Sequence, residues 1–299
     1  MRKVLKWVGI VLAGLVGVLA VAALVGYIVS ERRIAQTYTI ADEALTLPTD
    51  AAGLAEGQRL VIMRGCTDCH TPDLGGQVFI DDPMLGVIAT ANLTSGQGSA
   101  TAAYTIADWE RAIRHGVGPD GRGLLVMPSY EYAGLSDEQV AQMIAFLQTV
   151  PPVDRVPAEP ILKPLGRALF LMGQLPLMPA ELVDHDVAHD ASVPARASTE
   201  YGAYLSTTCT GCHQRNLAGG AVPGSAPGDP RSANLTPAGN LANWTLDDFK
   251  TALRSGMTPE GKVLDPAVMP WPIAAQMTDV ELEALWLYLQ SLPPASPAG

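Results

Sequence analysis

Two short cysteine motifs contain the residues of this chain best suited to hold a cofactor. "CTDCH" spans residues 66–70, "CTGCH" spans 209–213, and together they contain all four cysteines of the 299 residues. Zinc usually takes four ligands, and neither motif is accompanied by a second cysteine pair. A thioredoxin-like redox pair lies in a βαβ context, which the surrounding sequence does not suggest. The remaining interpretation is covalent attachment of a c-type haem, whose signature is C-x-x-C-H.

In this interpretation each motif supplies two thioether bonds to the porphyrin and one imidazole to the iron. The covalent attachments are expected at Cys66, Cys69, Cys209 and Cys212, and the first iron ligands at His70 and His213. A methionine sulfur is a suitable sixth ligand, and Met/His ligation raises the reduction potential. Of the ten methionines, Met127 and Met269 correspond to each other in an internal repeat, 61 and 60 residues after the first cysteine of their motifs.

The repeat covers most of the chain. "ANLT" at residue 91 recurs at 233, "VMP" at 126 recurs at 268, and a double proline at 151 recurs at 293. The offset is 142 residues at these marks and 143 at the cysteines. We therefore predict two related domains of roughly 100 residues each. They are expected at 53–153 and 197–295, joined by a linker at 154–196.

Each copy is predicted to be mainly helical. Residue pairs with capping-box spacing mark helix starts at Thr105/Asp108, Ser136/Gln139, Thr245/Asp248 and Thr278/Glu281. The final helix of each copy then shows apolar residues at i, i+3, i+4 and i+7, over 140–147 and 282–289. No long alternating strand pattern appears.

The amino terminus contains an uncharged run of 23 residues at 7–29. As a helix, this run would be about 34 Å long, enough to cross the hydrocarbon core of a bilayer. Basic residues precede it, so residues 1–6 are expected in the cytoplasm and everything after the helix outside. "AVA" at 20–22 resembles a signal-peptide cleavage site, but an h-region is typically about 7–15 residues long. We predict a single-pass anchor at 7–29 and a connecting segment at 30–52.

The exported part of the chain is acidic. Without the charged residues that flank the apolar run, 14 basic and 29 acidic side chains remain, a formal charge of -15. Nucleic-acid binding requires a basic surface and is therefore not expected. An acidic surface suits docking to a basic region of a protein partner.

Four further residues are candidates for cofactor binding. Asn92 and Asn234, together with Arg114 and Arg254, recur in the repeat and are expected to donate hydrogen bonds to haem propionates. Turn formation and a favourable charge near a helix end are their alternative roles.

The linker contains two unusual stretches. "ILKPLGRALFLMGQL" from residue 161 predicts a helix after its proline, packed between the two domains; contact with a membrane surface or a partner subunit is the alternative. "DHDVAHD" places His185 and His189 four residues apart, a spacing that could hold a metal on one helical face. We interpret this polar run as a solvated surface.

The chain resembles the cytochrome c subunits of membrane-bound alcohol and gluconate dehydrogenases, within the wider class I cytochrome c fold. The resemblance rests on "CTDCHT", "GVIATANLT", "DWERAIRHGVGPDGR" and "MPSYEYAGLSDEQV" and on their second-half counterparts. It implies a mainly α fold, with two class I cytochrome c domains in tandem after the transmembrane helix. It also implies two covalently bound haem c groups with axial pairs His70/Met127 and His213/Met269.

The resemblance further implies an electron carrier rather than an enzyme, with no catalytic residues of its own. We expect a dihaem cytochrome anchored in the bacterial inner membrane, with its haem domains in the periplasm. It would relay single electrons between a dehydrogenase or quinol-oxidising complex and a terminal acceptor, with redox proteins as partners. The alternatives are a dihaem enzyme of the peroxidase or thiosulfate-oxidising type, which needs an open iron site, and the haem subunit of a cbb3-type oxidase.

Overall fold

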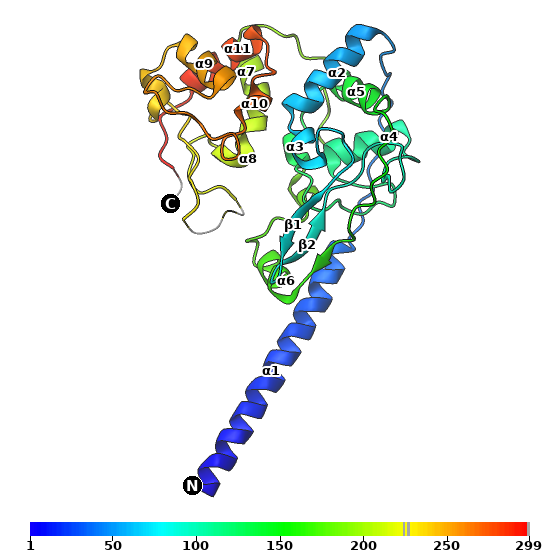
Figure 1. Ribbon diagram of the computed structural model, residues 1–299, viewed down its shortest axis with the longest axis vertical. Helices are drawn as coiled ribbons and strands as arrows, with labels where there is room; N and C mark the ends of the chain where they lie inside the picture. The colour runs from blue at the N-terminus through cyan, green and yellow to red at the C-terminus, as the bar shows by residue number, and fades with distance from the viewer. Residues whose placement is uncertain (224, 226–227, 298–299) are drawn as a thin grey trace.

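A long helix and two small helical domains make up the structure (Figure 1). The computed structural model describes residues 1–223, 225 and 228–297. Helix α1 covers Arg2–Ile34 and, among the described residues, is the one helix long and apolar enough to cross a membrane. We refer to residues 53–153 as domain 1, to 154–196 as the linker and to 197–295 as domain 2. The mainly helical class is confirmed.

Domain 1 combines short helices with a small sheet. Its helical elements are α2 (Ala51–Met63), α3 (Cys66–His70), α4 (Ile106–Glu110), the π-helical turn η1 (Arg111–His115), the 3-10 turn η2 (Ser129–Glu131) and α5 (Asp137–Leu147). Strands β1 (Val78–Asp82) and β2 (Gly86–Ala89) form an antiparallel hairpin. The linker strand β3 (Ile161–Leu162) extends the sheet beside β2, also antiparallel. This sheet is not evident from the sequence, because its strands, VFIDD, GVIA and IL, are short and do not alternate apolar with polar residues.

Domain 2 repeats the helices of domain 1. Its elements are α7 (Thr199–Ser206), the 3-10 turn η4 (Thr207–Cys209), α8 (Thr210–His213), the 3-10 turn η5 (Asn240–Asn243), α9 (Leu246–Ser255), α10 (Trp271–Ala274) and α11 (Asp279–Ser291). Where domain 1 has its hairpin, the described residues of domain 2 form only an isolated bridge between Gly220 and Ser232.

The first and last helices of each domain cross at a glycine. A Cβ atom on Gly57 in α2 would lie 2.0 Å from the carbonyl oxygen of Gln142 in α5. A Cβ on Gly202 in α7 would lie 2.0 Å from the carbonyl oxygen of Ala284 in α11. Only glycine allows backbones to approach so closely. The two crossings are therefore equivalent, although the two glycines lie at different distances from their cysteine motifs.

The predicted capping residues begin the helices. Thr105, Thr245 and Thr278 each form a reciprocal capping box with the acidic residue three positions later. Ser136 caps α5 alone, because Tyr204 of domain 2 takes over the reciprocal bonds. The Tyr204 hydroxyl accepts from the Ser136 backbone N–H at 3.0 Å and donates to the Gln139 side chain at 2.6 Å.

The two domains are joined by apolar and charged contacts. Buried side chains from both domains form one continuous cluster. Arg59 of α2 makes two 2.8 Å hydrogen bonds to the carboxylate of Glu281 in α11 and a third, of 3.1 Å, to the Gln276 carbonyl. A paired, two-pronged contact of this kind fixes orientation as well as distance.

Helix α6 (Pro164–Leu171) begins at the predicted proline, but its predicted position between the domains is wrong. It packs against α1 and against the hairpin turn, where a Cβ on Gly166 would lie 2.3 Å from the Leu85 carbonyl oxygen. The later part of the linker, which includes the 3-10 turn η3 (Pro179–Leu182), lies along domain 1.

The interpretation of "DHDVAHD" as a solvated surface is right for five of its residues, which are exposed, but wrong for its two histidines. This run is not helical, and the His189 side chain is only 4% exposed. His189 bonds to the Glu43 carboxylate and to the Ala133 carbonyl, each at 2.8 Å. Immediately afterwards, two linker carbonyls accept hydrogen bonds from the first N–H groups of α5. The linker is thus fastened to domain 1 because it satisfies donors that a helix start leaves free.

Candidate functional site

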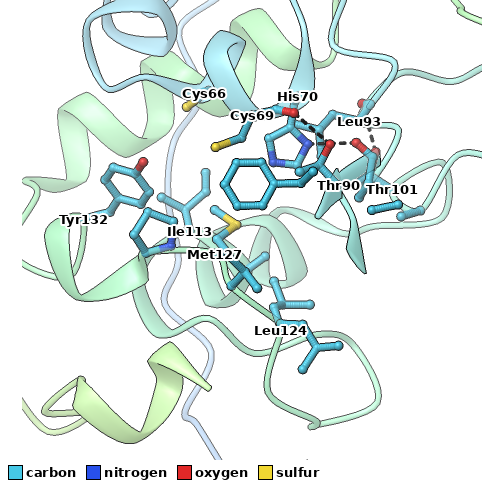
Figure 2. A pocket seen from close by; sticks show the side chains of 18 of the residues that line it. Cys66, Cys69, His70, Thr90, Leu93, Thr101, Ile113, Leu124, Met127 and Tyr132 are labelled. Carbon is cyan, nitrogen blue, oxygen red and sulfur yellow. Dashed lines mark hydrogen bonds between the residues drawn. The ribbon is translucent and has the colours of Figure 1, made fainter. Parts of the chain in front are cut away.

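A deep apolar cavity lies beside the first cysteine motif (Figure 2). Its volume is about 310 Å³. Its walls come from α3, the β1–β2 hairpin, α4, η1, the segment before η2, and α5. The lining includes Cys66, Cys69, His70, Phe79, Ile88, Leu93, Trp109, Ile113, Met127, Tyr132 and Met143. Met127, the predicted second ligand of the iron, therefore lines the same cavity as His70.

His70 is oriented by a backbone carbonyl. Its Nδ1 lies 2.8 Å from the Ala91 carbonyl oxygen, which can only accept, so Nδ1 carries the proton. The electron pair is then on Nε2, and Figure 2 shows the ring directed into the cavity. Burial lowers the pKa of His70, so the imidazole stays neutral at neutral pH. A neutral imidazole fixed through its other nitrogen is suited to bind a metal.

Met127 reaches the same cavity from the chain between η1 and η2 (Figure 2). The residue before it, Val126, has φ of +65°, which is a costly conformation for a β-branched residue. The Val126 N–H donates to the Leu177 carbonyl at 2.9 Å, and the Ser129 hydroxyl donates to the Ala112 carbonyl at 3.1 Å. Bonds on both sides of Met127 therefore hold its backbone in place.

Domain 2 contains the matching site. Its cavity has a volume of about 590 Å³ and is lined by residues that include Cys212, His213, Leu241, Trp244, Phe249, Leu253 and Met269. The His213 Nδ1 donates to the Ala233 carbonyl at 2.8 Å, as His70 does to Ala91. Burial lowers the pKa of His213 too. Cys209 packs against the shared core.

The thiols themselves do not resemble the activated thiols of redox motifs. Burial raises the pKa of both Cys66 and Cys209 to about 12. Reactive cysteines need a lowered pKa, because the thiolate is the nucleophile. No disulfide joins the four cysteines, all of which are among the described residues.

Asn92 and Asn234 each form side-chain hydrogen bonds that hold the loop in which they lie. Asn92 donates to the carbonyls of Val153 and Arg155 at 2.7 and 3.1 Å, and its side-chain oxygen accepts from Thr94. Asn234 donates to the Ala295 carbonyl at 2.7 Å in the same way. Both residues therefore tie the "ANLT" loop to the chain after the last helix. Asn234 lines the cavity of its domain, whereas Asn92 is not part of the cavity lining.

The two arginines lie outside the cavity linings. The guanidinium of Arg114 bonds to three carboxylates, and that of Arg254 bonds to Asp279 and to the Ala275 carbonyl. Contact of the asparagines and arginines with haem propionates stays a prediction.

Two further charged residues lie where the two motifs face each other. Arg64, just before the first motif, is 2% exposed and donates a hydrogen bond across the domain boundary. A Cβ on Gly211 in the second motif would lie 2.1 Å from the Glu131 carboxylate. Burial raises the pKa of Glu131 to about 7. Sequence analysis missed both residues because their repeat counterparts, Thr207 and Ile273, are different in kind.

The residues present in each domain fit a c-type haem. Each site combines two thiols, a neutral imidazole and a thioether against apolar walls. Thiols supply the covalent attachments, and imidazole with thioether is a donor pair that holds haem iron. Apolar walls exclude water, which favours electron exchange over chemistry at an open iron.

Comparisons with known proteins find cytochrome c domains in both halves of the chain. The family model for cytochrome c matches residues 54–151 and 200–293. The cytochrome c subunit of an alcohol dehydrogenase (quinone) from Gluconacetobacter polyoxogenes is 29% identical over 291 residues, covering 85% of this chain and 59% of that protein.

Two other relatives have a similar sequence identity to this chain. A diheme cytochrome c-type protein from Cereibacter sphaeroides is 28% identical, over 80% of this chain and 86% of its own length. The fructose dehydrogenase cytochrome subunit from Gluconobacter japonicus is 27% identical, over 85% of this chain and 56% of its own length. The chain thus spans less than two thirds of the dehydrogenase subunits that it matches.

Proposed function

The chain belongs to the cytochrome c family, and we propose that it is a membrane-tethered dihaem electron carrier on the periplasmic side of a bacterial inner membrane. It carries two covalently bound haem c groups, one in each domain. The observation that carries the proposal is the repeated site, in which a carbonyl-bound histidine and a methionine line one apolar cavity with both cysteines of the motif in domain 1 and with Cys212 in domain 2.

We propose that the two irons are six-coordinate. His70 and Met127 would bind the iron in domain 1, and His213 and Met269 the iron in domain 2. The haem supplies one-electron exchange, while the chain fixes both axial side chains and excludes water. A carbonyl bond to each histidine and bonds on both sides of Met127 keep the ligands in place, which lowers the reorganisation that accompanies a change of charge.

Contact between the two motifs supports a relay through both haems. Arg64, next to the first motif, bonds to Thr208, next to the second. Glu131 of domain 1 lies against Gly211, inside the second motif. The shared core and the Arg59–Glu281 pair hold this arrangement. Electrons would therefore pass between the haems within the chain, without a second docking event.

The partners follow from the relatives and from charge. The similar dehydrogenase cytochrome subunits suggest a dehydrogenase or quinol-oxidising complex as electron donor, with a terminal acceptor downstream. The formal charge of the whole chain is -11, and the basic residues around α1 make the exported part more acidic still. Such a surface favours docking to basic regions of partners. Helix α1, which is exposed as far as residue 25 and contacts α6 beyond it, would be the tether.

Replacing each proposed methionine ligand tests the function. We expect Met127→Ala and Met269→Ala each to remove half of the methionine–iron charge-transfer absorption, to lower the potential of one haem and to open that iron to added ligands. Met84→Ala, at an exposed methionine outside both cavities, is the matched control.

The unaltered protein provides the decisive spectrum. Charge-transfer absorption that accounts for both haems supports the carrier. A high-spin haem in the purified protein, or turnover of peroxide, would instead identify a dihaem enzyme and refute the proposal.

A further inference from the structure

Helix α6 is clamped to the last turns of α1 rather than to either cavity. The Arg167 guanidinium lies 4.3 Å from the centre of the Tyr27 ring, donates to the Ser30 hydroxyl at 2.8 Å and pairs with Glu31 at 2.6 Å. Arg33 of α1 in turn lies 4.3 Å from the centre of the Phe170 ring. Contacts in both directions make α6 and the end of α1 one rigid unit.

The position of Tyr27 sets the depth of this unit in a bilayer. Trp7 and Tyr27 are twenty residues apart in one helix, a rise of about 30 Å, which is the thickness of a hydrocarbon core. Trp and Tyr favour the two membrane interfaces. If α1 spans the membrane with Trp7 at one interface, Tyr27 lies at the other, and so does the Arg167 that stacks on it.

Leu171 reaches slightly deeper than Arg167. Its Cδ1 atom would lie 3.9 Å from a Cβ placed on Gly26, a residue inside the uncharged run of α1. The next residue, Met172, is 62% exposed, and Leu165 at the other end of α6 is 38% exposed. Met172, next to Leu171, is therefore at the depth where lipid headgroups meet acyl chains.

The hairpin turn belongs to the same surface. The Leu85 carbonyl accepts from the Lys163 N–H at 3.0 Å, and Gly166 packs directly on it. Met84 in this turn is 63% exposed. Figure 1 shows the hairpin turn and α6 at the end of domain 1 nearest α1. We call α6, Met172 and the turn at 82–85 the α6 platform.

We propose that the α6 platform lies in the outer interface of the lipid bilayer and holds domain 1 against the membrane. The inference rests on the proposed tether. Charges on and beside the platform nearly balance, because Asp81 and Asp82 accompany Lys163, and Arg167 is paired with Glu31. Apolar contact with lipid therefore drives the docking, which does not require anionic lipid.

Membrane docking would orient the haem sites. The β1–β2 hairpin supplies Phe79 and Ile88 to the cavity of domain 1, and Pro160, beside β3, also lines it. The same sheet thus connects the α6 platform to the cavity. Domain 1 would then be held to the bilayer both by α1 and by the α6 platform, and domain 2, which lies beside domain 1 (Figure 1), would be held through its contacts with domain 1.

Spin labels on the full-length protein test the docking. Cysteine would be introduced for labelling by Met172→Cys, Met84→Cys and Leu19→Cys, with Val280→Cys in α11 of domain 2, an exposed position outside the cavity, as the control. The haem-loaded, chemically reduced protein is reconstituted in phosphatidylcholine vesicles. Collision of each label with oxygen, which concentrates in lipid, is compared with collision with a water-soluble nickel chelate.

The expected result is lipid-like accessibility at 172, 84 and 19, and water-like accessibility at 280. Water-like labels at 172 and 84 beside a lipid-like label at 19 would overturn the docking and leave the tether intact. A water-like label at 19 would overturn both. Labels at 172 and 84 that are water-like in vesicles but shielded from both reagents in native membranes would show that a protein partner covers the platform, which also overturns lipid docking.

Discussion

Arg114 and Arg254 occupy the same position in the two copies of the repeat but lie in different surroundings. Each bonds to the aspartate that begins the last helix of its domain, Asp137 or Asp279. The Arg254 side chain is 41% exposed and its aspartate 76% exposed. The Arg114 side chain is fully buried, with Glu43 and Glu110 as further partners. One duplicated ion pair has thus become a buried network in domain 1 and stayed a surface contact in domain 2.

The segments that cover Arg114 explain the difference. Glu43 comes from the connection after α1, and His189, which bonds to Glu43, comes from the linker. Both segments lie against domain 1, so that domain is fastened to the chain on either side. Glu110 within the network has Lys250 as its counterpart in domain 2. Domain 1 is therefore built as the fixed base of the molecule, and domain 2 as a simpler unit docked on it.

Removing the covalent attachments should produce the largest change and test whether the two sites are equivalent. We expect Cys66→Ala/Cys69→Ala and Cys209→Ala/Cys212→Ala each to lose one covalent haem, because thioether formation needs the thiols. Intact mass and haem staining measure the loss. Loss of both haems from the Cys66/Cys69 variant, with only one lost from the other, would show that domain 2 depends on domain 1. Unchanged mass in either variant would refute the attachment sites.

Replacing each arginine in turn should lower the free energy of unfolding by very different amounts in the two domains. Arg114→Ala leaves Glu110, itself fully buried, without its cation, and we expect a loss of about 3–5 kcal/mol in the free energy of unfolding. Arg254→Ala removes an exposed pair, for which about 0–1 kcal/mol is expected. Denaturant unfolding of the haem-loaded protein measures both. Equal losses would contradict the contrast between a buried network and a surface contact.

The contrast between the two arginines also shows what the sequence could predict. The helices, their caps and the cysteine motifs follow local patterns, so Thr105, Thr245 and Thr278 could be placed in advance. The duplication selected Met127 and Met269, which line the two cavities with the histidines. It could not show that Arg114 is buried, because the residues that bury it come from segments outside the repeat.

The buried histidine of the linker and the contacts between the domains could not be predicted, for the same physical reason. "DHDVAHD" is polar, and its polarity correctly indicates groups that need partners. The sequence does not say that the partners are Glu43 and the Ala133 carbonyl rather than water. Arg64 and Glu131 were missed because each acts at a contact between the domains, where repeated residues have unlike surroundings. Tertiary contacts of non-repeated residues leave no periodic signal.

Substitutions at the two helix crossings should have similar effects, because these two sites, unlike the two arginines, have the same surroundings. A methyl group on Gly57 or Gly202 would collide with a backbone carbonyl that cannot move aside. We expect Gly57→Ala and Gly202→Ala each to lower the free energy of unfolding by about 1–3 kcal/mol, as overpacking does. Gly134→Ala, where the added atom meets nothing within 4 Å, should change it by less than about 0.5 kcal/mol. A response in one domain alone would break the equivalence of the crossings.

Glu131 should give the smallest effect and one that is specific to the domain boundary. Its counterpart is Ile273, so the pH dependence that it creates is not duplicated. Burial raises the pKa of Glu131 from 4.5 to about 7 in the folded chain, which therefore holds a proton that the unfolded chain releases. The stability contributed by this proton is complete below pH 4.5 and is lost as the pH rises through 7.

The free energy of unfolding should therefore fall between pH 5 and pH 8, with about 1–2 kcal/mol of the fall due to Glu131. Glu131→Gln keeps the shape without the charge, so it should remove this part of the slope and raise stability at pH 8. Glu138→Gln, at an exposed carboxylate of the same domain, should leave the slope unchanged. The measurement is urea unfolding across that pH range. An unchanged slope in Glu131→Gln would mean that the carboxylate is already ionised between the two motifs, with Arg64 as its compensating charge.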